Sequence, residues 1–243
     1  NKTQLKIWAD GDHARLDAGK SILTDWAVLG FFQMDDPHPI DHFLDAVARE
    51  YGVRDTFGET PVGWCSWYQY YSQVTSRQIQ HNLHRLKEIH NQLPLKKFQI
   101  DDGWQSKPGD WLSFRSSFPQ GLSSFAKEIE QAGFQAGIWI APFIVHPRSQ
   151  LRKKHPEWLL RTRSGKLAYA GFVWDTFTSA LDLTNREALE YVCQVVRTAA
   201  VAWNFPYLKL DFLYAAAVRC QYQDGTKTRA QVLRMGLEKI KSE

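Results

Sequence analysis

The chain has 243 residues, of which 44% are hydrophobic, 14% aromatic and 23% charged, so it holds enough apolar material for one sizeable core and is not a disordered protein. Thirty Lys and Arg residues against twenty-six Asp and Glu residues leave a net charge of +4. This small and scattered charge argues against nucleic acid or a membrane surface as the partner.

The N-terminal quarter of the chain divides into two segments. Residues 1–36 alternate weakly between polar and apolar and carry turn signals at residues 10–12 and 17–20, which predicts the last strands of an all-β region. Two prolines then interrupt the pattern, and residues 40–51 place apolar side chains at helical intervals before a glycine. We therefore expect residues 37–60 to form a connecting helix and a linker.

From residue 61 onward, short apolar runs alternate with longer amphipathic segments, which is typical of βα units on a parallel sheet. The pattern predicts four such units in residues 61–243. The expected strands are 62–67, 97–101, 135–140 and 207–211. The expected helices are 76–92, 122–132, a helix from the N-cap Asn185 to about residue 202, and 226–241, with an irregular charged stretch at 146–177.

Four βα units amount to half of an eight-stranded (β/α)₈ barrel, which takes about 250 residues by itself. Two arrangements remain open from the pattern alone. The strands form an open four-stranded α/β layer, or the chain is a piece of a longer protein whose barrel continues past residue 243. The incomplete β region at the front and the abrupt end favour the second arrangement.

In a parallel sheet the functional groups lie at the carboxyl ends of the strands, because the loops open there. Asp101 and Asp102 come directly after an apolar strand, where two adjacent carboxylates do not belong in a core. They are either a turn or capping pair, or acceptors for the hydroxyls of a ligand. A metal site is less favoured, because Asp211 is the only further candidate ligand at a strand end.

The last predicted strand ends in Lys209-Leu210-Asp211, so Lys209 and Asp211 project to one side of the sheet. Two such charges need each other or a ligand, and the lysine keeps the carboxylate ionised. An ionised, positioned carboxylate is what a covalent glycosyl-transfer nucleophile requires. The alternative is a structural ion pair.

Tryptophans also occur at the strand ends, where Trp67 follows the first strand and Trp139 lies near the end of the third. Core packing explains most tryptophans, but an indole also suits stacking on the C–H face of a sugar. Carboxylates, a lysine and indoles together favour a neutral, hydroxyl-rich substrate. Glycine-rich phosphate loops and a GxSxG nucleophile elbow do not occur in the sequence.

Several motifs in order resemble glycoside hydrolase family 36, the melibiase-type α-galactosidases and the related raffinose and stachyose synthases. They are Gly63-Trp64-Cys65-Ser66-Trp67, Asp101-Asp102-Gly103-Trp104, Gly109-Asp110-Trp111, Phe118-Pro119-Gln120-Gly121-Leu122, Gly137-Ile138-Trp139, His155-Pro156-Glu157-Trp158, Leu181-Asp182-Leu183-Thr184-Asn185 and Lys209-Leu210-Asp211. The resemblance implies a (β/α)₈ TIM barrel, of which this chain covers roughly the first half. It also implies a preceding β-sandwich domain, of which residues 1–36 resemble the C-terminal strands.

The resemblance also implies roles for individual residues. Asp211 resembles the catalytic nucleophile and Lys209 a ligand of the sugar hydroxyls. Asp101 and Asp102 resemble the carboxylates that hold the 4- and 6-hydroxyls of galactose. Two tryptophans, Trp67 and Trp139, match residues that line the pocket.

The sequence departs from the family pattern at two positions. Phe143 stands after Pro142, where members commonly have a glutamate, and Trp174-Asp175-Thr176 lies where many carry an arginine that contacts the sugar. The inner pocket therefore resembles the family while its rim differs, which leaves room for another sugar or aglycone.

The acid/base of a retaining mechanism lies on a later strand in the family, and we expect it beyond residue 243. After Asp211 the chain has only Asp224, Glu238 and Glu243, all of which we interpret as loop or helix-surface charges. The expected function is a retaining α-galactosidase that works through a covalent galactosyl–Asp211 intermediate. The alternatives are an α-galactosyltransferase of the raffinose-synthase type, a non-catalytic sugar-binding fragment and a bare α/β scaffold.

We expect no metal and no organic cofactor, and an α-galactoside oligosaccharide as the partner, with homo-oligomerisation left open. The longest near-apolar run, residues 136–145, is about half of a bilayer-spanning helix. Three widely spaced cysteines without a CxxC pair favour a reducing, cytoplasmic compartment.

Overall fold

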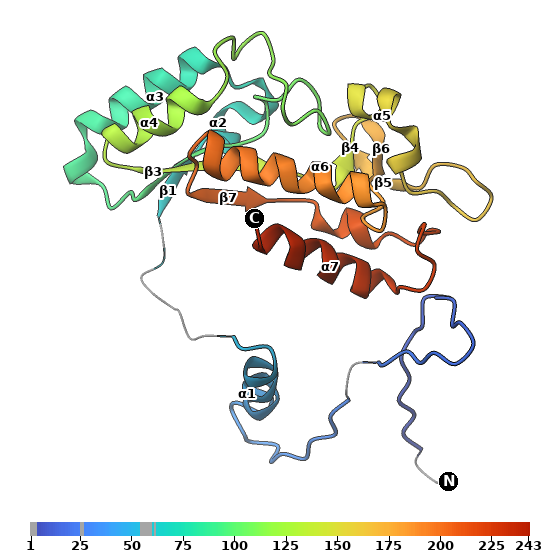
Figure 1. Cartoon of the computed structure of the whole chain (residues 1–243). Helices are drawn as coiled ribbons and strands as arrows, with labels where there is room; N and C mark the ends of the chain where they lie inside the picture. Colours follow the sequence, from blue (N-terminus) through green and yellow to red (C-terminus); the bar gives the residue numbers. More distant parts are fainter. Residues whose placement is uncertain (1–3, 25–26, 54–59, 61) are drawn as a thin grey trace. The chain divides into compact units, whose positions relative to one another are not determined.

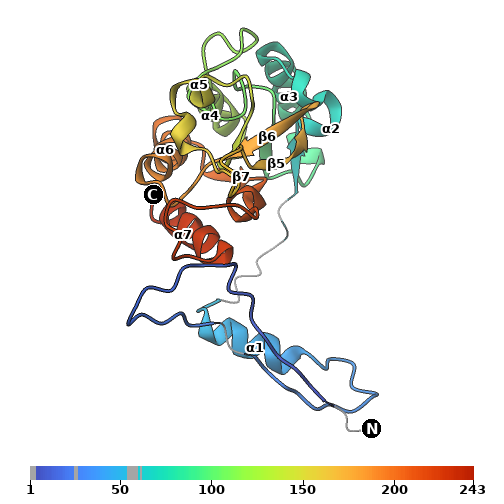
Figure 2. The ribbon, with the colours of Figure 1, turned by 90° about the vertical axis from the view of Figure 1, so that its right-hand side faces the viewer.

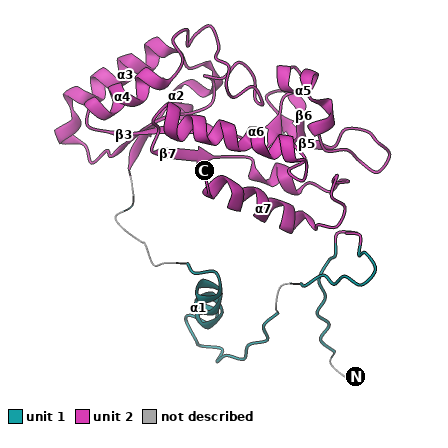
Figure 3. Cartoon of the chain, in the orientation of Figure 1, with its two compact units in different colours: residues 1–11, 16–60 teal, residues 12–15, 61–243 magenta. Residues whose placement is uncertain are grey.

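The computed structural model describes residues 4–24, 27–53, 60 and 62–243. The chain splits into two compact units: residues 1–11 and 16–60 form the first, and residues 12–15 and 61–243 form the second (Figure 3). Each unit is described by itself.

Among its described residues the first unit contains one helix, α1 (Asp41–Glu50), in the segment where the apolar spacing predicts it. Its side chains are not buried. Residues 4–24 and 27–36 form no strand in the structure, and their assignment to a β-sandwich domain stays a prediction.

The second unit is built on a four-stranded parallel sheet in the order β1-β2-β3-β7 (Figure 1). The strands are β1 (Gly63–Cys65), β2 (Lys97–Ile100), β3 (Gln135–Ile140) and β7 (Tyr207–Leu210). Helix α3 (Ser76–Glu88) connects β1 to β2, α4 (Ser123–Gln131) connects β2 to β3, α6 (Arg186–Arg197) precedes β7, and α7 (Arg229–Lys241) follows it. This is the predicted succession of four βα units.

Side-chain caps explain where the helices begin. Thr75 and Gln78 form a reciprocal capping box at the start of α3, and Thr228 and Gln231 form another at the start of α7. The predicted N-cap Asn185 accepts hydrogen bonds from two backbone N–H groups of α6. Each such cap stabilises its helix by about 1 kcal/mol. Short helical turns extend three of the connections: η2 (His90–Gln92), η4 (Thr198–Ala202) and η5 (Leu213–Ala217).

Two expectations about local structure are wrong. The first strand ends at Cys65, and Trp67 instead begins a short helix, α2 (Trp67–Tyr70), which is followed by η1 (Tyr71–Gln73). Strand β1 pairs with β2 only from Gly63 to Cys65, so the chain is free to turn after Ser66 donates its backbone N–H to Gln99.

The stretch expected to be irregular instead contains a second sheet. It is antiparallel, with the order β4-β6-β5, and its strands are β4 (Ile144–Val145), β6 (Thr176–Ala180) and β5 (Tyr169–Val173). Helix α5 (Gln150–Lys154) and turn η3 (Pro156–Trp158) precede β5. The arrow of β7 points toward the end of the unit where this sheet lies (Figure 1), and Figure 2 looks onto that end.

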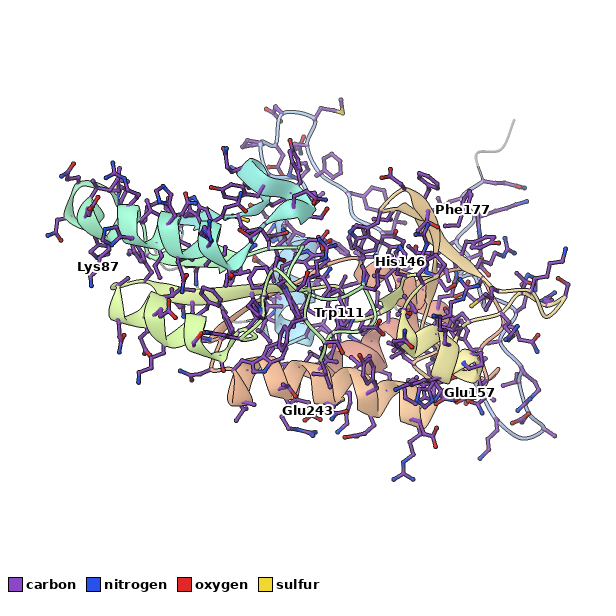
Figure 4. All side chains as sticks on the ribbon, turned by 90° about the horizontal axis from the view of Figure 1, so that it is seen from above. Lys87, Trp111, His146, Glu157, Phe177 and Glu243 are labelled. Carbon is purple, nitrogen blue, oxygen red and sulfur yellow. The ribbon has the colours of Figure 1, made fainter. Side chains whose placement is uncertain are left out.

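The core lies between the parallel sheet and its helices. Phe98 and Ile100 of β2 and Ile138 and Ile140 of β3 are completely buried, as period-two alternation predicts for one face of a sheet. Trp111 is equally buried in the interior of the unit, whereas Lys87 and Glu157 lie on its surface (Figure 4). None of the helices in the described ranges is long and apolar enough to cross a membrane.

The other face of the sheet carries the polar side chains. In the strand register, Gln99 lies beside Gly137 and Gly137 lies beside Tyr207. Two residues further along the strands, Trp139 lies beside Lys209. A Cβ atom on Gly137 would lie 2.6 Å from Cδ1 of Tyr207, so glycine lets β3 and β7 pack closely at this level. The polar groups at the carboxyl ends of β2, β3 and β7 are thereby held on one face.

Candidate active site

A cavity of about 360 Å³ opens at the carboxyl ends of the parallel strands. Its lining includes every site residue that the sequence predicts, which are Trp67, Asp101, Asp102, Trp139, Lys209 and Asp211. The remaining lining residues are Ser72, Val173, Trp174, Asp175 and Phe212. Residues more than a hundred positions apart in the sequence therefore face one space.

Asp101 is the most constrained carboxylate of the cavity. It is only 2% exposed, and its Oδ2 atom accepts hydrogen bonds from Nε2 of Gln99 at 2.5 Å and from Nζ of Lys209 at 3.0 Å. Its backbone N–H donates to Oγ of Ser66 at 2.9 Å. The carboxylate is thus paired with a cation and is fixed by donors on β2 and on β7, which are separated in the sheet by β3.

Lys209 keeps its charge because of this pairing. Partial burial lowers the pKa of its ammonium group, but the hydrogen bond and the charge of Asp101 outweigh that effect, so the pKa of Lys209 lies above its ordinary value. Its side chain remains 37% exposed, which leaves two of its three N–H bonds for the cavity. The predicted pairing of Lys209 with Asp211 is therefore wrong, because the anionic partner of Lys209 is Asp101.

Asp102 lies next to Asp101 but in a different environment. It is also 2% exposed, and its direct donors are neutral: Nε2 of Gln105 donates to Oδ1 at 2.5 Å, and Nε1 of Trp174 donates to Oδ2 at 2.7 Å. Burial raises the pKa of the Asp102 carboxyl, and the two hydrogen bonds and the charge of Arg115 offset only part of that rise.

Gly103 allows the chain after these two carboxylates to pass close to Ser72 of η1. Its φ is +124°, and a Cβ atom there would lie 2.8 Å from the backbone oxygen of Ser72. Only glycine combines this conformation with so close an approach. Ser72 itself lines the cavity, and its backbone oxygen also accepts a hydrogen bond from Arg115.

Asp211 directly follows β7 and is partly buried. Its Oδ2 atom accepts a hydrogen bond from Nε1 of Trp139 at 2.9 Å, and its Oδ1 atom accepts one from the backbone N–H of Phe212 at 2.8 Å. Phe212 adopts a left-handed conformation with φ of +51°. A non-glycine residue in that region is strained by about 1–3 kcal/mol, and such strain is typical of functional sites.

The two predicted tryptophans contribute differently. Trp139 is 2% exposed and packs edge-on against Trp111 at 5.6 Å, so it is both a core residue and the donor that orients Asp211. Trp67 is half-buried at the start of α2, where it packs against Tyr71 at 5.3 Å and presents its ring to the cavity.

Trp174 and Asp175 belong to the site although sequence reasoning did not assign them to it. They form the two-residue connection between β5 and β6, and both have positive φ values, +54° and +56°. The unusual Trp-Asp-Thr segment was the only sequence signal. The other departure, Phe143, is completely buried and does not line the cavity.

Cys65 supports the carboxylates without being a nucleophile. Its Sγ atom lies 3.4 Å from Oδ2 of Asp101 and accepts a hydrogen bond from Gln99. Burial, together with the charge of Asp101, raises the pKa of the thiol to about 11. The thiol therefore stays protonated and donates to Asp101 at neutral pH.

The three carboxyl groups that follow Asp211 in the sequence do not line the cavity. Asp224 accepts hydrogen bonds from the hydroxyl and backbone N–H of Thr226, and Glu243 pairs with Arg197. Within the residues that the structure describes, no group of three or more His, Cys, Asp or Glu side chains is arranged to hold a metal ion.

Comparisons with known proteins agree with this geometry. The Melibiase family model matches residues 45–235. The α-galactosidase AgaA of Geobacillus stearothermophilus is 27% identical over 127 residues, which are 49% of this chain and 17% of that protein. The α-galactosidase Mel36A of Lactobacillus acidophilus is 35% identical over 81 residues, which are 30% of this chain and 11% of that protein.

Solved structures give the same result for the fold. TtGalA, an α-galactosidase from Thermus thermophilus in complex with p-nitrophenyl α-D-galactopyranoside, superposes with a TM-score of 0.66 and 37% identity, covering 76% of this chain and 36% of that one. The predicted fold class is confirmed: the parallel sheet and its helices are part of a (β/α)₈ barrel. The chain spans less than a fifth of the two curated relatives above. Because the family model matches most of its residues, the chain belongs to the Melibiase family.

Proposed function

We propose that the cavity binds the terminal α-galactosyl group of an oligosaccharide and that the protein hydrolyses it with retention of configuration, through a covalent intermediate on Asp211. One observation carries the proposal. The Asp211 carboxylate, oriented by Trp139 and the backbone of Phe212, faces the same space as a Lys209-paired Asp101 and a buried Asp102. A nucleophile and a set of hydroxyl ligands are thus assembled around a volume suited to a sugar.

In the proposed complex, Asp101 and Asp102 accept hydrogen bonds from the 4- and 6-hydroxyls of galactose. Lys209 uses its free N–H bonds for a further hydroxyl. An axial 4-hydroxyl points out of the sugar ring plane, so two adjacent carboxylates buried on one side of the cavity select it over an equatorial one. The ring of Trp67 offers an apolar surface for the C–H face of the sugar.

The proposed reaction has two displacements. In the first, an oxygen of Asp211 bonds to C1 of the galactosyl group, the bond from C1 to the leaving oxygen breaks, and that oxygen takes a proton from a general acid. In the second, the same group acts as a base and removes a proton from water, the water oxygen bonds to C1, and the ester bond to Asp211 breaks. The N–H groups of Trp139 and Phe212 hold the Asp211 carboxylate in both steps.

The acid/base is a second carboxyl group about 5–5.5 Å from the nucleophile. We place it on a later barrel strand, past the residues of this chain. Two observations support that placement. Asp224, Glu238 and Glu243 do not line the cavity, and the chain spans 36% of TtGalA.

The substrate class has support from a relative that is more than a third identical. TtGalA has been solved with p-nitrophenyl α-D-galactopyranoside and with stachyose, the latter at a TM-score of 0.67 and 36% identity. Both ligands carry an α-galactosyl group. We therefore propose α-galactosides as the substrates here.

Trapping the intermediate tests the proposal. The protein, expressed from its complete coding sequence, is incubated with a 2-fluoro-α-galactosyl fluoride, and its intact mass and peptide map are measured. We expect one sugar adduct on the peptide that contains Asp211, and none in the Asp211→Asn variant. An adduct on another residue would refute the assigned nucleophile, and no adduct in a protein that binds galactose would favour a non-catalytic sugar-binding role. Product analysis with added sucrose separates hydrolysis from galactosyl transfer.

A further inference from the structure

The tip of the β5–β6 hairpin is built in an unusual way. Val173 pairs with Thr176, so Trp174 and Asp175 alone make the connection, and both lie in the left-handed region. Two-residue turns of this kind strongly prefer Asn-Gly or Asp-Gly, because a Cβ atom is unfavourable at positive φ. Asp tolerates the left-handed region, but a tryptophan persists there only when other contacts hold it in place.

Trp174 is held by the parallel sheet. Its Nε1 atom donates to Oδ2 of Asp102 at 2.7 Å. Its ring centroid lies 5.4 Å from that of Phe212 and 6.3 Å from that of Trp139. The hairpin tip is thereby attached to Asp102 and also packs on the two residues that orient Asp211.

The four carboxylates that line the cavity differ in depth. Asp101 and Asp102 are buried, Asp211 is partly buried and Asp175 is exposed. In the complex proposed above, the galactosyl group is held by the two buried carboxylates with C1 at Asp211, so its C1 substituent belongs on the more exposed side of the cavity, which Asp175 also lines.

From these contacts we propose that the hairpin tip is a specificity-determining element, in which Trp174 positions Asp102 and Asp175 contacts hydroxyls of the sugar that follows galactose. This inference rests on the proposed function and names which residues set its selectivity. Trp174 is a positioning residue, because it acts through Asp102. The carboxylate of Asp175 can accept hydrogen bonds from the hydroxyl groups of a sugar, but an aromatic leaving group has no such hydroxyl groups to donate.

The environment of Asp102 gives the positioning role a separate signature. The charged groups that face Asp102 are Asp101 and Arg115, with Asp175, Lys209 and Asp211 around the same cavity. Burial raises the pKa of Asp102, and the N–H of Trp174 is one of the groups that opposes the rise. Removing that N–H alone leaves the buried carboxylate with one donor fewer and raises its pKa further.

The first test removes the N–H of Trp174 and keeps an aromatic ring. In Trp174→Phe we expect galactose affinity, measured by calorimetry, to fall about tenfold, and the acid limb of kcat/KM to move up by about one pH unit. The matched control is Trp203→Phe, because Trp203 packs against Trp104 and Phe114 and does not line the cavity. The control is expected to change neither quantity.

A shape-preserving variant guards against a folding effect. Replacing Trp174 with benzothienylalanine puts sulfur in place of the indole N–H and keeps the ring size, so it should give the same loss of affinity and the same shift of the acid limb. If both variants bind galactose like the parent, with an unshifted acid limb, Trp174 does not position Asp102. In that case an adduct trapped on Asp211 still supports the proposed function. If the unsubstituted protein neither forms the adduct nor binds galactose, the proposed function and the role of the hairpin tip are both refuted.

The second test removes the Asp175 carboxylate without disturbing the turn. Asp175→Gly is suited to it, since glycine adopts positive φ freely. We expect kcat/KM to fall about tenfold more for raffinose, whose leaving group is a sugar, than for p-nitrophenyl α-galactoside. Equal losses on the two substrates, or no loss on either, would overturn the role of Asp175.

Discussion

The strand ends of the parallel sheet and the tip of the β5–β6 hairpin both supply side chains to one cavity, but they position them by different means. The register of the parallel strands holds Asp101, Trp139 and Lys209 on one face of the sheet. Trp139 lies beside Lys209, and Lys209 donates a hydrogen bond to Asp101. Trp174 and Asp175 are held by a strained turn and by one hydrogen bond to Asp102. Side chains at the ends of regular strands can be predicted from the sequence. The conformation of the turn, in contrast, depends on contacts that form only in the folded chain.

The largest expected effect concerns the strand end that carries Asp211. Asp211→Asn keeps the shape of the side chain and removes its nucleophilic charge, so turnover should fall by about 10⁴-fold or more while galactose affinity stays within a few-fold. Rates with p-nitrophenyl α-galactoside and calorimetry measure the two quantities. Asp224→Asn is the matched control, because Asp224 lies outside the cavity lining. A similar loss in that control would mean that Asp224, and not a residue on a later strand, serves the chemistry.

The next effect separates binding from chemistry at a second strand end. Asp101→Ala removes the partner of Lys209 and the acceptor of the Gln99 hydrogen bond, so galactose affinity should fall about 100-fold or more. The buried donors left behind should also cost about 2 kcal/mol of unfolding free energy. Calorimetry and chemical denaturation test both. If the Asp101→Ala variant still binds galactose with unchanged affinity, Asp101 is a structural ion-pair residue and not a ligand of the sugar.

A smaller effect tests whether register itself holds the strand ends together. Gly137→Ala places a methyl group against the ring of Tyr207 and should reduce the unfolding free energy by about 1–3 kcal/mol. Gly225→Ala is the control, since a Cβ atom there meets nothing within 4 Å. Thermal unfolding measures both variants. If the two variants are equally stable, the close approach of β3 and β7 at this level does not limit the fold.

The smallest effect is a pH dependence in which binding and stability move in opposite directions. Burial raises the pKa of Asp102 above its ordinary 3.8, so protonating Asp102 favours the folded state. The contribution of Asp102 to the free energy of unfolding is fully present below pH 3.8 and is lost as the pH rises through the raised pKa of Asp102. Galactose binding needs the carboxylate, so it should weaken by about tenfold per pH unit once the pH falls below the raised pKa.

Calorimetry and thermal unfolding between pH 7 and pH 3 would follow the two quantities separately, and Asp102→Asn supplies the reference without a titrating group. Galactose affinity that stays constant down to pH 3, which is below the ordinary carboxyl pKa of 3.8, would show that an ionised Asp102 is not required. The strand-end and hairpin contributions would then have to be assigned again.

The comparison also separates what could be predicted from what could not. The strands of the parallel sheet and the starts of its helices follow from alternation and from capping residues such as Thr75 and Asn185. The six predicted site residues meet in one cavity because parallel strands present their carboxyl ends at the same edge. The predicted pairing of Lys209 with Asp211 is wrong, because the lysine side chain reaches across the sheet to Asp101.

The antiparallel sheet was missed because its strands are short and do not alternate cleanly. Tyr169, Phe172 and Phe177 are more than half exposed, so the apolar residues of this hairpin do not mark a buried face. The apolar run that ends at Trp67 predicts a strand up to that residue, but strand pairing stops at Cys65. In both places the outcome depends on what the segment packs against.

The sequence by itself determined the βα succession, the capped helix starts and the polar strand ends, because these depend on side-chain periodicity and on neighbours within a few positions. It also carried the motifs that place the chain in its family. Only the tertiary structure decided that Trp174 donates to Asp102, because a hydrogen bond across 72 positions forms only once β5, β6 and the parallel sheet have packed together. The different surroundings of Asp101 and Asp102, one paired with a cation and one with neutral donors, are likewise set by packing and not by their shared motif.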